Sequence, residues 1–178
     1  MNLSFQDLIP ADFSPESRVW IYQANRLLTL SEALELEKIL DSFISDWKAH
    51  GQPVKGFANL FFGQFIVLIA DEKNTTVSGC STDNSVRMIK VIEDVFKISL
   101  FDRNQLAFVI KDKIQLLPLA QVEYALKNQF IQSDTLFFDH SVSTKKELIE
   151  RWIVPLSTAW LQNRFRLTFT FLSFNASK

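Results

Sequence analysis

The stretch Lys55-Gly-Phe-Ala-Asn-Leu-Phe-Phe-Gly-Gln-Phe-Ile-Val-Leu-Ile-Ala-Asp71 decides the fold. It contains two runs rich in β-branched and aromatic residues, Lys55 to Phe62 and Gln64 to Asp71, which Gly63 separates. Runs of this length and composition are typical of β-strands, and a glycine between them is typical of a turn. We therefore expect two strands in a hairpin, with one long strand bent at Gly63 as the alternative.

An amphipathic helix is expected on each side of this hairpin. Before it, Thr29-Leu-Ser-Glu32 is a capping box. Apolar residues at helical spacing follow it, so the sequence predicts a helix from Ser31 to Ala49. After the hairpin, a similar pattern runs from Val86 to Phe96, and this helix is expected to begin near Thr82 or Asp83.

Short strands are expected at Val19 to Tyr22 and at Leu106 to Ile110. Up to about residue 110 the order is then strand, helix, strand, strand, helix, strand, which is the order of the split βαβ or ferredoxin-like motif. The sequence therefore predicts an α+β fold with a ferredoxin-like centre. The last third should add helices and strands: a hairpin partner at Ile114 to Leu117, a helix over Val122 to Phe130, a strand at Leu136 to Phe138 and a helix after the capping box Thr144 to Glu147.

The C-terminal tail has the periodicity of a strand. Phe165, Leu167, Phe169 and Phe171 alternate with Arg166, Thr168 and Thr170. Because an unpaired apolar strand promotes aggregation, we expect this tail to be paired. It either completes a sheet of its own chain or pairs with a partner chain, and a homodimer through residues 164–174 is the prediction for the second case.

Length and composition restrict the class of protein. The 178 residues fit a single domain over residues 1–178, and a net charge of −1 gives no general attraction to nucleic acid or to an anionic membrane. No apolar run reaches about 18 residues, so no membrane span is expected. The N-terminus has no signal-peptide pattern and there is one cysteine, which favours a cytoplasmic location.

Two other ligand classes have weak sequence support. Lys55 to Phe62 partly matches the signature of the RNA-recognition motif, but Asn59 stands where a second stacking ring is needed. The two histidines and the single cysteine lack the spacing of metal ligands. We therefore expect no nucleic acid, no metal and no cofactor.

The candidate site is the loop 78–87, which contains the only cysteine, Cys80, and precedes the second amphipathic helix. A helix N-terminus has unpaired N–H groups and a partial positive charge, which suit an anion. We expect a non-catalytic module that binds a small anionic ligand or a protein partner through Ser78, Ser81, Thr82, Ser85 and Arg87. The alternative without a ligand is that Ser81, Thr82 or Asp83 caps the helix and Cys80 packs in the core.

An enzymatic alternative uses Cys80 as a nucleophile. His140 would be its base, with Asp139 or Asp134 orienting the ring, in a thiol-dependent hydrolase or transferase. The phosphatase pattern Cys-x5-Arg does not fit, because six residues separate Cys80 from Arg87.

Four phrases resemble a small uncharacterised bacterial family whose members often carry the label "ABC transporter ATPase": Ser17-Arg-Val-Trp-Ile-Tyr-Gln-Ala-Asn-Arg26, Pro53-Val-Lys-Gly56, Phe61-Phe-Gly-Gln-Phe-Ile66 and Val77-Ser-Gly-Cys-Ser-Thr-Asp83. The resemblance spans most of the chain before about residue 160 and implies no catalytic residues. ATP hydrolysis by such a protein needs Gly-x-x-x-x-Gly-Lys-Ser/Thr to hold the phosphates. This chain has no Gly-Lys pair, so the label is not supported.

Overall fold

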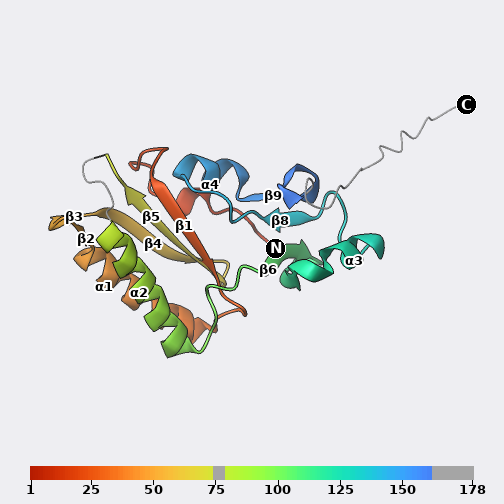
Figure 1. The fold of residues 1–178 in the computed structure, drawn as a ribbon, viewed down its shortest axis with the longest axis horizontal. Coiled ribbons are helices and arrows are strands. Elements are labelled where there is room, and N and C mark those ends of the chain that lie inside the picture. The colour runs from red at the N-terminus through yellow and green to blue at the C-terminus, as the bar shows by residue number, and fades with distance from the viewer. Residues whose placement is uncertain (74–78, 162–178) are drawn as a thin grey trace, which may run out of the picture.

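The hairpin predicted between residues 55 and 71 supplies two of the three strands of the first sheet. In the computed structural model, β4 (Lys55–Phe61) and β5 (Phe65–Asp71) are antiparallel, and β1 (Arg18–Gln23) pairs with the other side of β5. The strand order is therefore β1-β5-β4 (Figure 1). Every residue of β5 is buried, because this central strand is covered on both faces. The structure describes residues 1–73 and 79–161, with side chains for 1–73 and 82–161.

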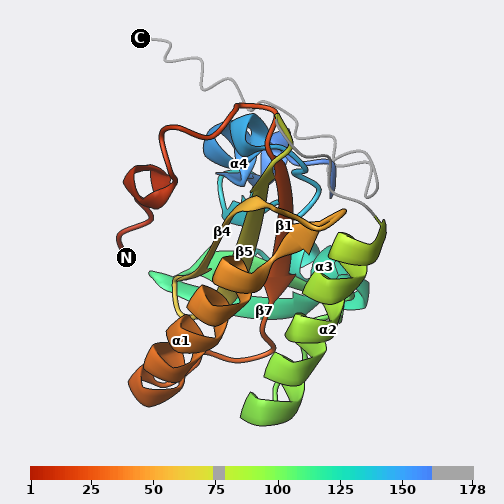
Figure 2. The ribbon, with the colours of Figure 1, turned by 90° about the vertical axis from the view of Figure 1, so that its left-hand side faces the viewer.

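Two helices cover one face of this sheet, α1 (Leu30–Asp46) and α2 (Gly79–Phe96) (Figure 2). The predicted capping box is confirmed, since Thr29 Oγ1 accepts from the amide of Glu32 and the Glu32 carboxylate accepts from the amide of Thr29. Helix α2 begins earlier than expected, at Gly79. Most of the segment predicted as the loop 78–87 is therefore helical.

A second sheet contains β6 (Gln105–Ile110), β7 (Lys113–Pro118), β8 (Leu136–Phe138) and β9 (Ile153–Pro155), in the order β7-β6-β8-β9. The predicted hairpin of β6 and β7 is confirmed, and its turn residues Lys111 and Asp112 both have positive φ angles. The remaining elements are α3 (Val122–Lys127), α4 (Lys145–Arg151), the small strands β2 (Lys48–Ala49) and β3 (Gln52–Pro53), and the 3-10 turns Gln6–Leu8, Leu119–Gln121 and Leu156–Thr158.

The α+β class is confirmed, and the ferredoxin-like centre is not. Three strands have the expected arrangement, because β1 and β4 are parallel with β5 between them. The fourth expected strand, β6, pairs with β7 and β8 in the second sheet instead of with β1. The physical reason is that Phe108 of β6 is fully buried against β8 and the α3 region. As a result, no strand of the described chain runs along the outer edge of β1.

The main core lies between the two sheets and is rich in aromatic rings. Trp152 is fully buried, and its ring centroid lies 4.9–5.8 Å from those of the five phenylalanines Phe5, Phe61, Phe62, Phe65 and Phe138. This cluster joins the N-terminal segment, both sheets and the end of α4. A single domain over 1–178 stays a prediction, since residues 162–178 lie outside the described chain.

A buried lysine attaches the N-terminal segment to this core. Lys145, at the start of α4, is 7% exposed. Its ammonium group donates to the carbonyl oxygens of Pro10, Ala11 and Phe13, at 2.7, 3.3 and 2.8 Å. Three carbonyl acceptors satisfy the three N–H donors of one ammonium group.

Across the described ranges, no helix combines the length and apolar character that a membrane crossing requires.

Candidate functional site

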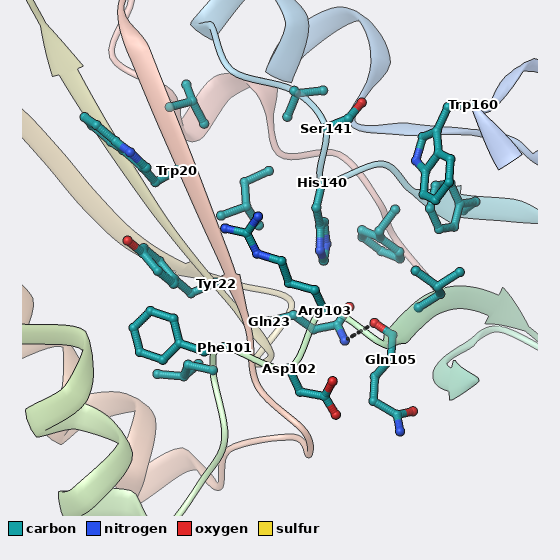
Figure 3. Close-up of a pocket in the computed structure, with 17 residues that line it drawn as sticks. Trp20, Tyr22, Gln23, Phe101, Asp102, Arg103, Gln105, His140, Ser141 and Trp160 are labelled. Carbon is teal, nitrogen blue, oxygen red and sulfur yellow. Dashed lines mark hydrogen bonds between the residues drawn. The ribbon is translucent and has the colours of Figure 1, made fainter. Parts of the chain in front are cut away.

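A cleft of about 330 Å³ lies along the outer edge of β1, between the two sheets (Figure 3). One wall comes from the segment that joins α2 to β6. The opposite wall comes from β8 and the residues after it. The lining residues are Val19, Trp20, Ile21, Tyr22, Gln23, Leu100, Phe101, Asp102, Arg103, Gln105, Leu106, Phe137, Phe138, His140, Ser141, Val142 and Trp160. The cleft occupies the side of β1 where a ferredoxin-like sheet has its fourth strand.

Main-chain hydrogen bonds close both ends of this edge. At one end the amide of Val19 donates to the carbonyl of Ser143, at 2.9 Å. At the other end the amide of Asn25 donates to the carbonyl of Ser99, at 3.1 Å. Because successive residues of a strand point their N–H groups to opposite sides, the amide and carbonyl of Ile21 share the edge of Val19. No described residue bonds to them.

Two buried polar atoms of the cleft also have no hydrogen-bond partner among the described residues. Gln23 is 6% exposed, and its Nε2 donates to the carbonyl of Gln105 at 3.0 Å, but its Oε1 has no partner. The second atom is Nε2 of His140, whose ring points into the cleft (Figure 3). Buried polar groups of folded proteins are nearly always hydrogen-bonded, so two such atoms in one cleft make it the candidate site.

His140 is uncharged at neutral pH. Part of the residue is exposed, but burial of the ring lowers the pKa of His140 from 6.5 to about 4, and the charge of Asp139 opposes this shift only in part. The ring packs edge-on against Phe65, with centroids 5.5 Å apart. A neutral imidazole can donate or accept a hydrogen bond through Nε2, depending on its tautomer.

The pKa of His140 predicts a pH-dependent stability. As the pH falls from 6.5 to about 4, the unfolded chain binds a proton at His140 before the folded chain does, so the free energy of unfolding falls. The loss is up to about 3 kcal/mol. Urea denaturation at pH 7 and pH 4.5 should show a smaller acid-induced loss for His140→Phe than for the wild type. His50→Asn, an exposed control, should lose as much as the wild type.

The mouth of the cleft combines aromatic rings with a cation. The rings of Tyr22 and Phe101 pack edge to face at 5.6 Å, and Trp160 lies on the opposite side (Figure 3). The exposed side chain of Arg103 lies across the cleft and forms no ion pair with any described residue. Burial raises the pKa of Tyr22, although a hydrogen bond with Ser85 and the charge of Arg103 oppose this, so its hydroxyl stays protonated at pH 7.

Of the residues predicted for the anion site, Ser85 and Arg87 do not share one surface. Ser85 is fully buried, and its hydroxyl donates to the carbonyl of Thr82 at 2.7 Å. Arg87, two residues further along α2, is exposed. Residues two apart on a helix point to different faces. Ser78 and the side chains of Cys80 and Ser81 lie outside the described residues.

In the predicted Cys–His–Asp arrangement, the hydrogen bond between Asp139 and His140 is not formed. The carboxylate of Asp139 accepts from the amide of Ser141 at 2.8 Å and from Nη1 of Arg151 at 3.4 Å. It forms no hydrogen bond with His140, whose buried Nε2 has no partner among the described residues. Asp134 is exposed in the segment before β8.

The described side chains contain no group of three His, Cys, Asp or Glu residues that could hold a metal ion. Comparisons of the whole chain with protein-family models, with curated proteins and with solved structures gave no match.

Sequence reasoning placed His140 among the candidates and missed Gln23 and Arg103. Gln23 ends an apolar strand, where a polar residue is ordinary. Arg103 follows α2 in a polar segment that looks like a solvated connection. The only sequence signal for Gln23 was an uncharged polar residue at the end of an apolar strand. If such a strand end is buried, each polar atom of the glutamine needs a hydrogen-bond partner.

Proposed function

We propose that this protein is a non-catalytic binding module that takes a small organic anion in the cleft beside β1. The observation that carries the proposal is the pair of buried atoms, Gln23 Oε1 and His140 Nε2, which line the same cleft without a partner in the described chain. A buried polar atom without a hydrogen bond costs roughly 1–3 kcal/mol. Because an amide oxygen only accepts, a ligand that removes the cost at Gln23 needs an N–H or O–H donor in addition to its anionic group, and His140 Nε2 can donate or accept.

The side chains around these atoms favour a planar anion. The guanidinium of Arg103 can bind a carboxylate through two parallel hydrogen bonds. The rings of Phe101 and Trp160 suit a flat apolar body, and uncharged His140 adds no second charge. The volume of about 330 Å³ suits a small molecule. A protein partner that inserts an acidic side chain is the alternative occupant.

A titration with 4-hydroxybenzoate tests this proposal, because its hydroxyl group can donate to Gln23 Oε1. The compound should raise the melting temperature and change the tryptophan emission, because Trp20 and Trp160 line the cleft. Arg103→Gln should weaken binding about tenfold or more, by loss of the charge-assisted bonds. Arg87→Gln, the matched control on α2, should bind as the wild type does.

Two results would contradict the cleft as the anion site. One is no effect of 4-hydroxybenzoate or inorganic phosphate at millimolar concentration. The other is loss of binding in Arg87→Gln but not in Arg103→Gln, which would return the site to the start of α2, where the sequence predicted it.

The thiol-dependent enzyme is the second candidate function, and it depends on Cys80. A nucleophilic cysteine should react with iodoacetamide near neutral pH, with an apparent pKa well below about 8.5. We expect slow alkylation in the folded protein and rapid alkylation in urea. Fast alkylation of the folded protein that His140→Phe slows would favour the enzyme instead.

Three sequence predictions remain part of the proposal. A cytoplasmic location is supported by the single cysteine. A ferredoxin-like centre is supported by the order β1-β5-β4 of the first sheet. A homodimer through residues 164–174 is supported by the strand periodicity of that segment, which lies outside the described residues.

A further inference from the structure

The cleft also contains main-chain groups that a ligand can bind. The N–H and C=O of Ile21 point to the outer edge of β1, which lines the cleft, and no described residue bonds to them. A free N–H and C=O on a strand edge are the groups that bind an extended peptide in β-strand addition. A ligand that contains an amide can therefore form a pair of hydrogen bonds here that a simple carboxylic acid cannot form.

The free part of this edge is short. At one end, the main chain of Val19 is bonded to Ser143. At the other end, the main chain of Asn25 is bonded to Ser99. The residues between these bonds, Trp20 to Ala24, span about 13 Å in an extended strand. A long peptide strand would collide with both connections, so the edge has room for one or two residues of a ligand.

The side chains of the cleft set the groups that such a ligand must carry. Gln23 Oε1 only accepts, so it needs an N–H or O–H donor. The Arg103 guanidinium only donates, and a carboxylate is its best partner. The carboxylate of Asp102 points away from this guanidinium and leaves it free for a ligand (Figure 3). Together with the C=O of Ile21, the cleft thus calls for two N–H donors and one carboxylate.

We propose that the ligand of the cleft is an N-acylated dipeptide with a free α-carboxylate. One amide N–H donates to the C=O of Ile21, the other donates to Gln23 Oε1, and the carboxylate binds Arg103. A carbonyl oxygen of the ligand accepts from the N–H of Ile21, and an aromatic C-terminal side chain packs against Phe101. This inference rests on the proposed function and names the chemical class of its organic anion.

N-acetyl-alanyl-phenylalanine tests the proposal, and the analogue with an ester in place of the amide between the two residues is the matched control. The ester lacks one N–H donor, so we expect the amide compound to bind about tenfold or more tightly in a tryptophan fluorescence titration. Binding should also slow the hydrogen exchange of the Ile21 amide about tenfold or more. The amides of Trp20 and Tyr22 face β5 and should not change.

A longer peptide distinguishes this ligand from the C-terminus of a protein partner. Four further residues at the N-terminal end should not raise the affinity, because the bonds at Val19 and Asn25 close the edge. A gain of about tenfold or more would assign the cleft to a protein C-terminus and overturn the proposal.

The remaining outcomes separate this inference from the proposed function. If 4-hydroxybenzoate binds and Arg103→Gln weakens its binding, but the amide and ester compounds bind equally, the dipeptide ligand is wrong and the proposed function stands. Unchanged exchange at Ile21 in the complex with the amide compound has the same meaning. If neither 4-hydroxybenzoate nor the amide compound binds, the proposed function fails and this inference fails with it.

Discussion

Trp152→Ala should lower the free energy of unfolding by about 3–5 kcal/mol, the usual cost of removing a fully buried large aromatic side chain. Trp152 is fully buried between the two sheets, with five phenylalanine rings around it. The rings cannot close the resulting cavity, because they come from separate elements of both sheets and the N-terminal segment. Urea denaturation followed by circular dichroism measures the loss.

Trp152→Phe is the matched control. It keeps one ring in place and removes Nε1, a buried donor without a partner among the described residues. We expect a loss of about 1–2 kcal/mol, since the smaller volume costs packing and the loss of an unpaired N–H group offsets part of that cost. A loss below about 1 kcal/mol for the alanine variant would contradict the central place of Trp152 in the core.

Lys145→Met should lower the free energy of unfolding by about 2–4 kcal/mol. Methionine keeps most of the length of the side chain, so the change mainly removes the ammonium group. The carbonyls of Pro10, Ala11 and Phe13 then lose their charged donor, two of them from bonds of 2.7 and 2.8 Å. Denaturation in urea measures the loss.

Lys146→Met is the control, because the neighbouring side chain is exposed. It should change stability by less than about 0.5 kcal/mol. Limited proteolysis gives a second readout, since loss of the Lys145 bonds should speed cleavage within residues 5–16 in Lys145→Met and not in Lys146→Met. Equal stability and equal cleavage of the two variants would show that Lys145 does not hold the N-terminal segment.

The elements that sequence predicted well are those with local signals. The capping box at Thr29, the hairpin around Gly63 and the turn at Lys111-Asp112 depend on residues within a few positions of each other. The start of α2 was placed three or more residues too late, because small polar residues such as Ser81 and Thr82 also occur in loops.

The sheet partner of β6 could not be read from the sequence. The sequence of an apolar strand does not show which neighbour it pairs with, and the burial of Phe108 against β8 depends on residues about 30 positions further along the chain. The cleft exists because β6 does not pair with β1, so the cleft could not be predicted from the sequence either. His140 was a candidate because the chain has two histidines, but its role with Gln23 depends on two sheets meeting.

The bonds that close the ends of the β1 edge join main-chain atoms, Val19 to Ser143 and Asn25 to Ser99. Such bonds form whatever the identity of the side chains, except for proline at a donor position. Mutations can therefore exchange the residues of the walls while the frame around them persists. Over evolutionary time, one architecture of this kind can acquire new ligands without passing through an unstable ancestor.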